Sequence, residues 1–160
     1  MGAVYFYHLT RRPLEVTLPV LLDKARGAGW RVLVRGTDAA RLDWLDEKLW
    51  LGPEDGFLPH GRDGGAHDAR QPVLLSTRPG PAPNDAECLM CVDGAEIVPE
   101  EIAMAERACI LFDGHDPEAT ARARAQWKAL TDAGCAAQYW SEESGKWEMK
   151  AEAAAAPATG

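Results

Sequence analysis

Two short, continuously apolar segments constrain the fold of this chain most strongly. Cys88–Val92 reads CLMCV and Cys109–Phe112 reads CILF. Runs of this kind are typical of strands that are buried on both faces, as in a parallel sheet covered by helices. Val4–Leu9 (VYFYHL), Arg31–Arg35 (RVLVR) and Pro72–Ser76 (PVLLS) add further strand-like segments. The sequence therefore predicts a sheet whose central strands do not meet solvent.

Helical segments alternate with these strands. A stripe of apolar residues follows Pro13 and ends near Gly27, and a second helix begins after Gly36-Thr37-Asp38 and runs to Trp50. Pro99–Glu106 suits a short helix. Asp116-Pro117-Glu118 is a strong helix start, with Gly134 as the stop. Strands alternating with helices predict a single α/β domain with an open, mostly parallel sheet and helices on both faces.

The ends of the domain follow from composition. Ala136–Trp140 reads as a closing strand, and Trp147 suits a further short one. Residues 151–160 (AEAAAAPATG) offer no apolar anchor, so we expect a folded domain over residues 1–150 and a disordered alanine-rich segment beyond it.

The overall charge and the cysteines narrow the function classes. The formal net charge is −8, which disfavours broad nucleic-acid binding because such binding depends on a basic surface. No apolar run is long enough to span a bilayer, and the N-terminus lacks the pattern of a secretion signal. Four cysteines scattered through apolar segments do not suggest a disulfide scaffold, so the cytoplasm is the expected compartment.

Motifs for catalysis or cofactor binding are weak. The first strand is followed by His8-Leu9-Thr10-Arg11-Arg12, which lacks the glycines that a dinucleotide-binding turn requires. Cys88 and Cys91 form a lone C-x-x-C inside a strand, where alternation sends the two side chains to opposite faces. The histidines stand singly. We therefore expect no catalytic residue, no cofactor and no metal, with a small nucleotide-binding enzyme as the alternative.

Two surfaces remain as candidate binding sites. On the helix 119–134, Arg124, Trp127 and Lys128 stand at i, i+3 and i+4 and share one face. Two cations around an indole suit an anionic, partly apolar ligand, although a solvated helix face explains the pattern equally well. Trp50 and Phe57 flank a Gly-Pro break and are typical of protein-interface anchors.

The order of several segments resembles a known family. The relevant segments are VYFYHL, RLDWLDEKLW, GFLPHG, PVLLS, CILFDGHD, ARARAQWKALTDAG and QYW. Together they resemble the chi subunit of bacterial DNA polymerase III holoenzyme, over nearly the whole chain up to Lys150. The resemblance implies a Rossmann-like fold without a nucleotide site, and a non-catalytic adaptor in the clamp-loader assembly.

The resemblance also implies partners and site residues. Members of that family bind the acidic C-terminal tail of single-stranded DNA-binding protein. The tail pocket would be formed by Arg124, Trp127 and Lys128, with Phe112 and Asp113 along its edge.

A second partner is implied as well. The psi subunit or a repair helicase would bind near Trp50 and Phe57. The chain departs from the family at Thr120, where a basic residue is common, and it carries Arg122 as an added cation.

Overall fold

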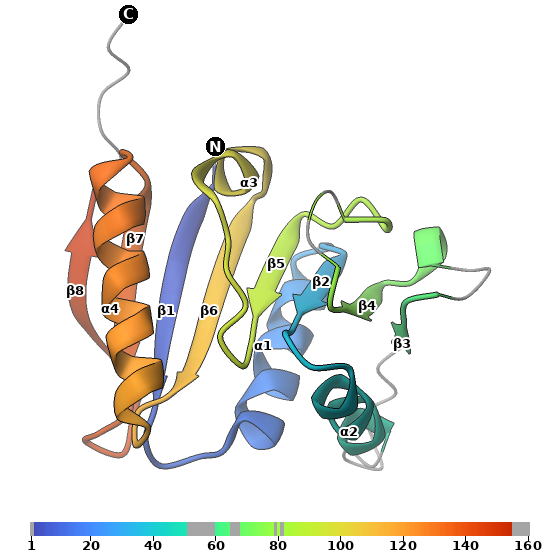
Figure 1. Cartoon of the computed structure of the whole chain (residues 1–160), viewed down its shortest axis with the longest axis horizontal. Coiled ribbons are helices and arrows are strands. Elements are labelled where there is room, and N and C mark those ends of the chain that lie inside the picture. The colour runs from blue at the N-terminus through green and yellow to red at the C-terminus, as the bar shows by residue number, and fades with distance from the viewer. Residues whose placement is uncertain (1, 51–59, 65–67, 79, 81, 155–160) are drawn as a thin grey trace, which may run out of the picture.

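The computed structural model describes residues 2–50, 60–64, 68–78, 80 and 82–154. Within these residues one eight-stranded sheet has the strand order β3-β4-β2-β5-β6-β1-β7-β8 (Figure 1). The strands are β1 (Ala3–Leu9), β2 (Val32–Arg35), β3 (Gly61–Arg62), β4 (Val73–Ser76), β5 (Cys88–Cys91), β6 (Arg107–Asp113), β7 (Ala136–Ser141) and β8 (Glu148–Ala153). The helices are α1 (Leu14–Gly27), α2 (Ala39–Trp50), α3 (Pro99–Met104) and α4 (Pro117–Asp132), with a 3₁₀ turn at Asp68–Arg70.

The predicted α/β class with an open, mostly parallel sheet is confirmed. Every pair of neighbouring strands is parallel except β7 and β8. Parallel neighbours need crossover connections. Helices α1 to α4 supply those after β1, β2, β5 and β6, whereas β3, β4 and β5 follow one another without an α-helix in the described residues. The carboxyl ends of the parallel strands consequently meet at one edge, which faces the bottom of Figure 1.

The structure differs from the prediction at both edges of the sheet. Gly61–Arg62, which lacks the apolar residues of the predicted strands, pairs with β4 as the short strand β3. At the other edge β8 begins at Glu148 and continues to Ala153. The first three residues of the segment expected to be disordered therefore belong to the sheet, because their backbone pairs with β7 and Ala153 packs partly against the core.

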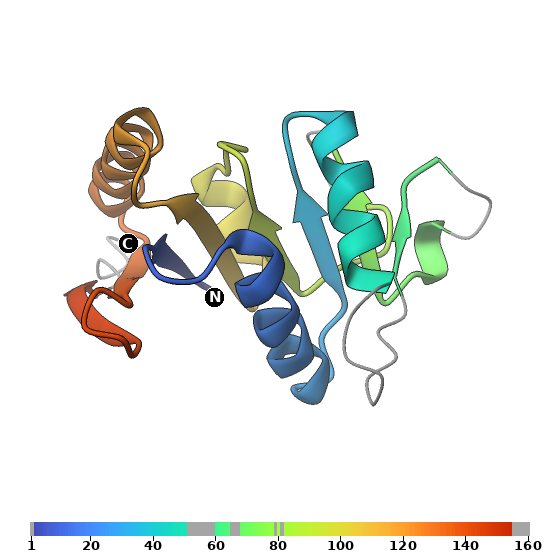
Figure 2. The same cartoon turned by 90° about the horizontal axis from the view of Figure 1, so that it is seen from below.

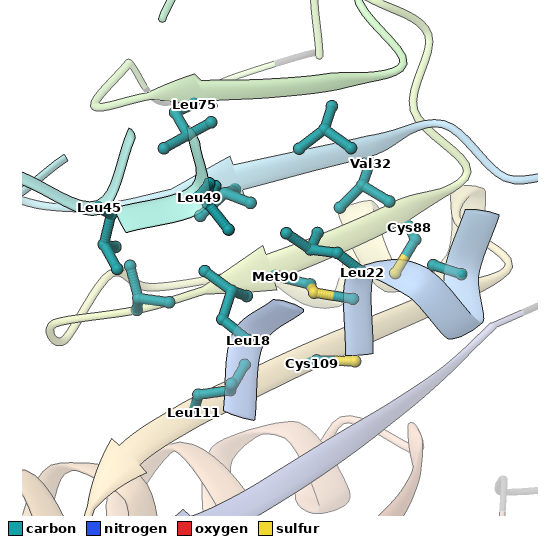
Figure 3. Packing of buried hydrophobic residues seen from close by; sticks show 14 of the residues in the cluster. Leu18, Leu22, Val32, Leu45, Leu49, Leu75, Cys88, Met90, Cys109 and Leu111 are labelled. Atoms are coloured by element: carbon teal, nitrogen blue, oxygen red, sulfur yellow. The ribbon is translucent and has the colours of Figure 1, made fainter. Parts of the chain in front are cut away.

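Two buried clusters cover the two faces of the sheet. Alternating strand residues, such as Val34 and Leu33 on β2, enter different clusters. One cluster includes Leu18 and Leu22 of α1, together with leucines of α2, while the other includes α3 and α4. Figure 2 shows α1 and α4 on opposite sides of the strands, and Figure 3 shows the first cluster at close range. Full burial of such leucines contributes about 1.5–3 kcal/mol each.

The cysteines are distributed as the alternation predicts. Cys88 packs in the cluster under α1 and Cys91 packs in the opposite one, so the prediction for this pair is confirmed. Cys109, on the neighbouring strand, lies on the same face as Cys88. In the described part of the chain, no three His, Cys, Asp or Glu side chains gather in a way that could hold a metal ion.

Thiol labelling should separate Cys135 from the other three cysteines. Burial raises the pKa of Cys91 to about 12, and a hydrogen bond with Cys88, together with burial, raises the pKa of Cys109 well above its usual value. Burial also raises the pKa of Cys135, but this side chain is only half-buried while the other three are buried, so it alone should react with iodoacetamide in the native protein. Mass spectrometry after a short labelling pulse checks this, and Cys135→Ser should abolish the native label. Equal labelling of Cys88 would contradict the buried arrangement.

Helix α4 forms where the sequence predicts it. The Asp116 side chain accepts a hydrogen bond of 2.9 Å from the Glu118 N–H, and Pro117 occupies the first helical position. The helix ends at Asp132, and Gly134 follows with a φ of 91° that favours glycine. Among the described residues, no helix combines the length and the apolar character needed to cross a membrane.

Candidate functional site

An open hollow of about 580 Å³ lies between α4 and the strands β7 and β8. It is the place where the predicted helix face meets the sheet, and we call it the α4–β7 hollow. Its lining residues are His8, Arg124, Trp127, Tyr139, Ser141, Glu143, Lys150 and Ala151. Arg124 and Trp127 are thus brought together as the helical spacing predicts.

The apolar wall of the hollow is a cluster of aromatic rings. The Trp127 ring meets the buried Phe6 ring edge-on, with centroids 5.4 Å apart. Tyr139 stands edge-on to Trp127, with centroids 6.1 Å apart, and stacks on Phe6 at 6.4 Å. Such ring pairs contribute about 0.5–1.5 kcal/mol beyond their buried area. Trp127 is therefore held firmly by the core while its remaining surface faces the hollow.

Arg124 provides the positive charge of the hollow. It is exposed, and within the described part of the chain its guanidinium makes no hydrogen bond or ion pair. Lys150 lies on the opposite wall, where its ammonium is 3.2 Å from Glu148. Glu143 adds a negative charge at the rim. An unpaired guanidinium beside aromatic rings suits a carboxylate ligand that also carries an apolar group.

Tyr139 supplies a neutral polar group to the same wall. Burial raises the pKa of its hydroxyl, and the charge of Arg124 acts in the opposite direction. The hydroxyl shares a hydrogen bond of 2.9 Å with Nδ1 of His8. The hydroxyl therefore stays protonated near neutral pH, and it does not place a competing anion beside Arg124.

Lys128 occupies a different position from the one expected. Its ammonium lies 2.8 Å from the Asp132 carboxylate, one helical turn further on, and the side chain is 78% exposed. That hydrogen bond raises the pKa of Lys128. The side chain is not among the residues that line the hollow, and its ammonium pairs with Asp132 instead.

Phe112 and Asp113 lie beside a second cavity rather than in the hollow. The Phe112 ring is buried and stacks on the His8 ring, with centroids 5.0 Å apart. One Asp113 oxygen accepts a hydrogen bond of 2.9 Å from the His115 N–H. Phe112 therefore supports the hollow from behind through His8, whereas Asp113 organises the turn after β6.

The remaining sequence-predicted residues are placed as follows. Trp50 is the last residue of α2, but its side chain and all of Phe57 lie outside the described residues. Thr120 is half-buried in the first turn of α4 and does not line the hollow.

Sequence reasoning missed the residues that the sheet contributes. His8 on β1 pairs in register with Ser141 on β7, and Lys150 comes from the edge strand β8. The signal for His8 and Tyr139 was their place near the carboxyl ends of two aromatic strand segments. Only the strand order makes these two ends neighbours, and α4 then crosses beside them.

Comparison with known proteins identifies the family. A family model described as "DNA polymerase III chi subunit, HolC" matches residues 1–138. The "Probable DNA polymerase III subunit chi" of Rickettsia prowazekii (strain Madrid E) is 25% identical over 112 residues, which cover 67% of each chain. Because the family model matches far more than half of the residues, the chain belongs to the DNA polymerase III chi subunit family. This membership does not favour the alternative of a nucleotide-binding enzyme.

Proposed function

We propose that this member of the chi subunit family is a non-catalytic cytoplasmic adaptor that links single-stranded DNA-binding protein to the clamp-loader assembly of DNA polymerase III. In this proposal the α4–β7 hollow binds the acidic C-terminal tail of the DNA-binding protein. The observation that carries the proposal is the unpaired guanidinium of Arg124 beside the half-buried rings of Trp127 and Tyr139.

The chemistry of such a tail matches the hollow in two respects. Its terminal carboxylate can take two parallel hydrogen bonds from the Arg124 guanidinium. Its last apolar side chain can pack on Trp127, which the Phe6 contact holds in place. Lys150 adds a second cation for the acidic residues that precede the end of the tail. Charge-assisted bonds of this kind contribute about 1.5–3 kcal/mol.

Arg124→Ala should weaken tail binding by about 10–100-fold, which corresponds to the loss of one charge-assisted interaction. Fluorescence anisotropy with a labelled acidic peptide that ends in an apolar residue and a free carboxylate measures the affinity. Arg122→Ala is the matched control, because it removes the same charge from the same helix but from outside the hollow. A peptide with an amidated C-terminus should bind wild type as weakly as the free peptide binds Arg124→Ala.

Lys128→Ala provides a second comparison. The ion pair with Asp132 already holds this ammonium outside the hollow, so its removal should weaken tail binding by less than about fivefold. Equal affinities of wild type and Arg124→Ala, or a larger loss for Lys128→Ala than for Arg124→Ala, would contradict the assignment of the tail pocket.

We also propose a second protein partner at Trp50 and Phe57, a psi subunit or a repair helicase. Support for this part comes from the resemblance of the segments around these two aromatic residues. Trp50→Ala and Phe57→Ala should leave tail affinity unchanged while reducing recovery of the second partner in a pull-down from the native cell extract. Arg124→Ala should weaken tail binding and leave recovery of the second partner unchanged. Loss of both activities in one variant would contradict two separate surfaces.

A further inference from the structure

A larger cavity of about 750 Å³ lies at the carboxyl edge of β1, β5 and β6. It is separate from the α4–β7 hollow, because none of the residues lining the hollow lines this cavity. Next to this cavity the chain leaves β2 and β5 in opposite directions across the sheet. From β2 it runs to β3 and β4 on one side, and from β5 it runs to β6 on the other. Ligands of open α/β sheets bind at such a position.

One corner of this cavity carries excess positive charge. Arg122 extends from α4 to the loop after β5, and its Nη1 lies so near Gly94 that an added Cβ would be 2.5 Å away. The adjacent Asp93 pairs with Arg41 of α2 at 3.3 Å. Arg41 is thus paired with Asp93, whereas the Arg122 guanidinium reaches the next residue, Gly94. Within the described residues, Arg122 makes no hydrogen bond or ion pair of its own.

The acidic residues of the cavity limit the charge of a ligand. Asp113 accepts a hydrogen bond from a backbone N–H of its own turn, and Asp116 caps α4. These carboxylates and Glu15 line the side where α1 and α4 begin. Arg11 and Arg12 line the same side, and the Arg11 guanidinium is bonded to the Glu143 carbonyl oxygen. With three carboxylates against two arginines, these helix starts do not favour a chain of phosphates. The Arg122 corner instead suits a group of low charge, such as a carboxylate, which a guanidinium binds through two parallel hydrogen bonds.

The rest of the cavity suits an apolar body. Trp44, Phe112 and Ala123 contribute apolar side chains to the lining. Arg41 stacks on the Trp44 ring at 4.6 Å, which keeps the guanidinium beside that wall.

We propose that this cavity binds a small organic acid, with its carboxylate between Arg122 and Arg41 and its apolar body against Trp44 and Phe112. The site does not depend on the tail-binding proposal, because it uses the opposite side of α4. The ligand differs in chemistry from a nucleotide, since it has one carboxylate and no phosphate.

The test is a titration with hydrocinnamate, a phenyl ring joined by a short chain to a carboxylate, followed by proton–nitrogen NMR of the full-length protein. Saturable shifts should appear at the Gly94 amide and at the Arg122 side chain. Arg122→Ala should raise the dissociation constant by about tenfold or more, while Arg124→Ala, the matched loss of charge, should leave it unchanged. Arg122→Lys should give an intermediate value, and thermal melts verify that the variants are folded.

Two further probes make the outcome decisive. Hydrocinnamide, which lacks the charge, and inorganic pyrophosphate, which lacks the apolar body, should both bind more weakly than hydrocinnamate. The proposal is overturned if hydrocinnamate shifts only residues of the α4–β7 hollow, if Arg122→Ala binds it as wild type does, or if either probe binds equally well. Failure here leaves the tail-binding result intact, since that result depends on Arg124.

Discussion

Replacement of Arg35 by alanine should lower the free energy of unfolding by about 3 kcal/mol, because it leaves a largely buried carboxylate without its partner. Arg35 lies at the carboxyl end of β2, and its side chain is 6% exposed. Its guanidinium binds Glu101 of α3 through two hydrogen bonds of 2.6 and 3.0 Å. It also donates to the carbonyl oxygens of Gly80 and Glu96.

Glu101 stabilises the charged form of Arg35 in this largely buried position. Burial by itself lowers the pKa of Arg35, but the hydrogen bond and the charge of Glu101 outweigh it, so that the pKa is raised overall. Glu101 also accepts a hydrogen bond of 3.2 Å from the Val98 N–H at the start of α3. Loss of Arg35 therefore disturbs the loop before α3 as well as the pair itself.

Urea unfolding of wild type and Arg35→Ala measures this effect. Arg41→Ala is the control, because the ion pair between Arg41 and Asp93 is longer and the Arg41 side chain is 44% exposed. This variant should lower the free energy of unfolding by less than about 1 kcal/mol. Arg35→Met combined with Glu101→Leu should recover only part of the loss, because the two carbonyl oxygens still lack a donor. A loss for Arg35→Ala no larger than that of the control would show that the pair contributes little.

The central part of the fold was predictable because its signals are local and strong. Cys88–Cys91 and Arg107–Asp113 contain continuous apolar runs, and Pro117 with Gly134 marks both ends of α4. The edge strands lack such signals. Strand β8 (EMKAEA) is largely exposed and is fixed by backbone pairing with β7. A strand held in this way leaves no periodic pattern of apolar residues to detect.

The candidate site was predictable only where it is built by one helix. The i, i+3 spacing of Arg124 and Trp127 places them together, and the structure brings both to the α4–β7 hollow. The i, i+4 spacing likewise brings Lys128 near Asp132, and the structure shows the lysine in this ion pair rather than in the hollow. Tyr139 and Lys150 come from the strands β7 and β8 rather than from the helix. Their approach depends on strand order, which helical periodicity does not encode.

Replacement of Glu142 by alanine should lower the free energy of unfolding by about 2–3 kcal/mol, because a buried carboxylate that accepts several backbone N–H groups is lost. Glu142 directly follows β7 and is 2% exposed. One of its oxygens accepts hydrogen bonds from the N–H groups of Thr10, Arg11 and Arg12, at 3.3, 2.9 and 2.8 Å. These three residues lie in the loop between β1 and α1.

Glu142 thereby connects the walls of the two cavities. The loop that it holds lines the larger cavity, while its neighbours Ser141 and Glu143 line the α4–β7 hollow. Arg11 strengthens the connection by donating two hydrogen bonds, of 3.0 and 2.8 Å, to the Glu143 carbonyl oxygen. We therefore expect Glu142→Ala to loosen the β1–α1 loop as well as to lower global stability.

Hydrogen exchange separates these two effects. In Glu142→Ala the amides of Thr10, Arg11 and Arg12 should exchange faster by a larger factor than amides in the centre of β6, which report global unfolding. Glu142→Gln retains an acceptor oxygen without the charge, so its loss of stability should be about half as large. Glu143→Ala is the matched control and should change stability by less than about 0.5 kcal/mol, because that side chain is exposed. Equal effects at positions 142 and 143 would mean that the carboxylate does not hold the loop.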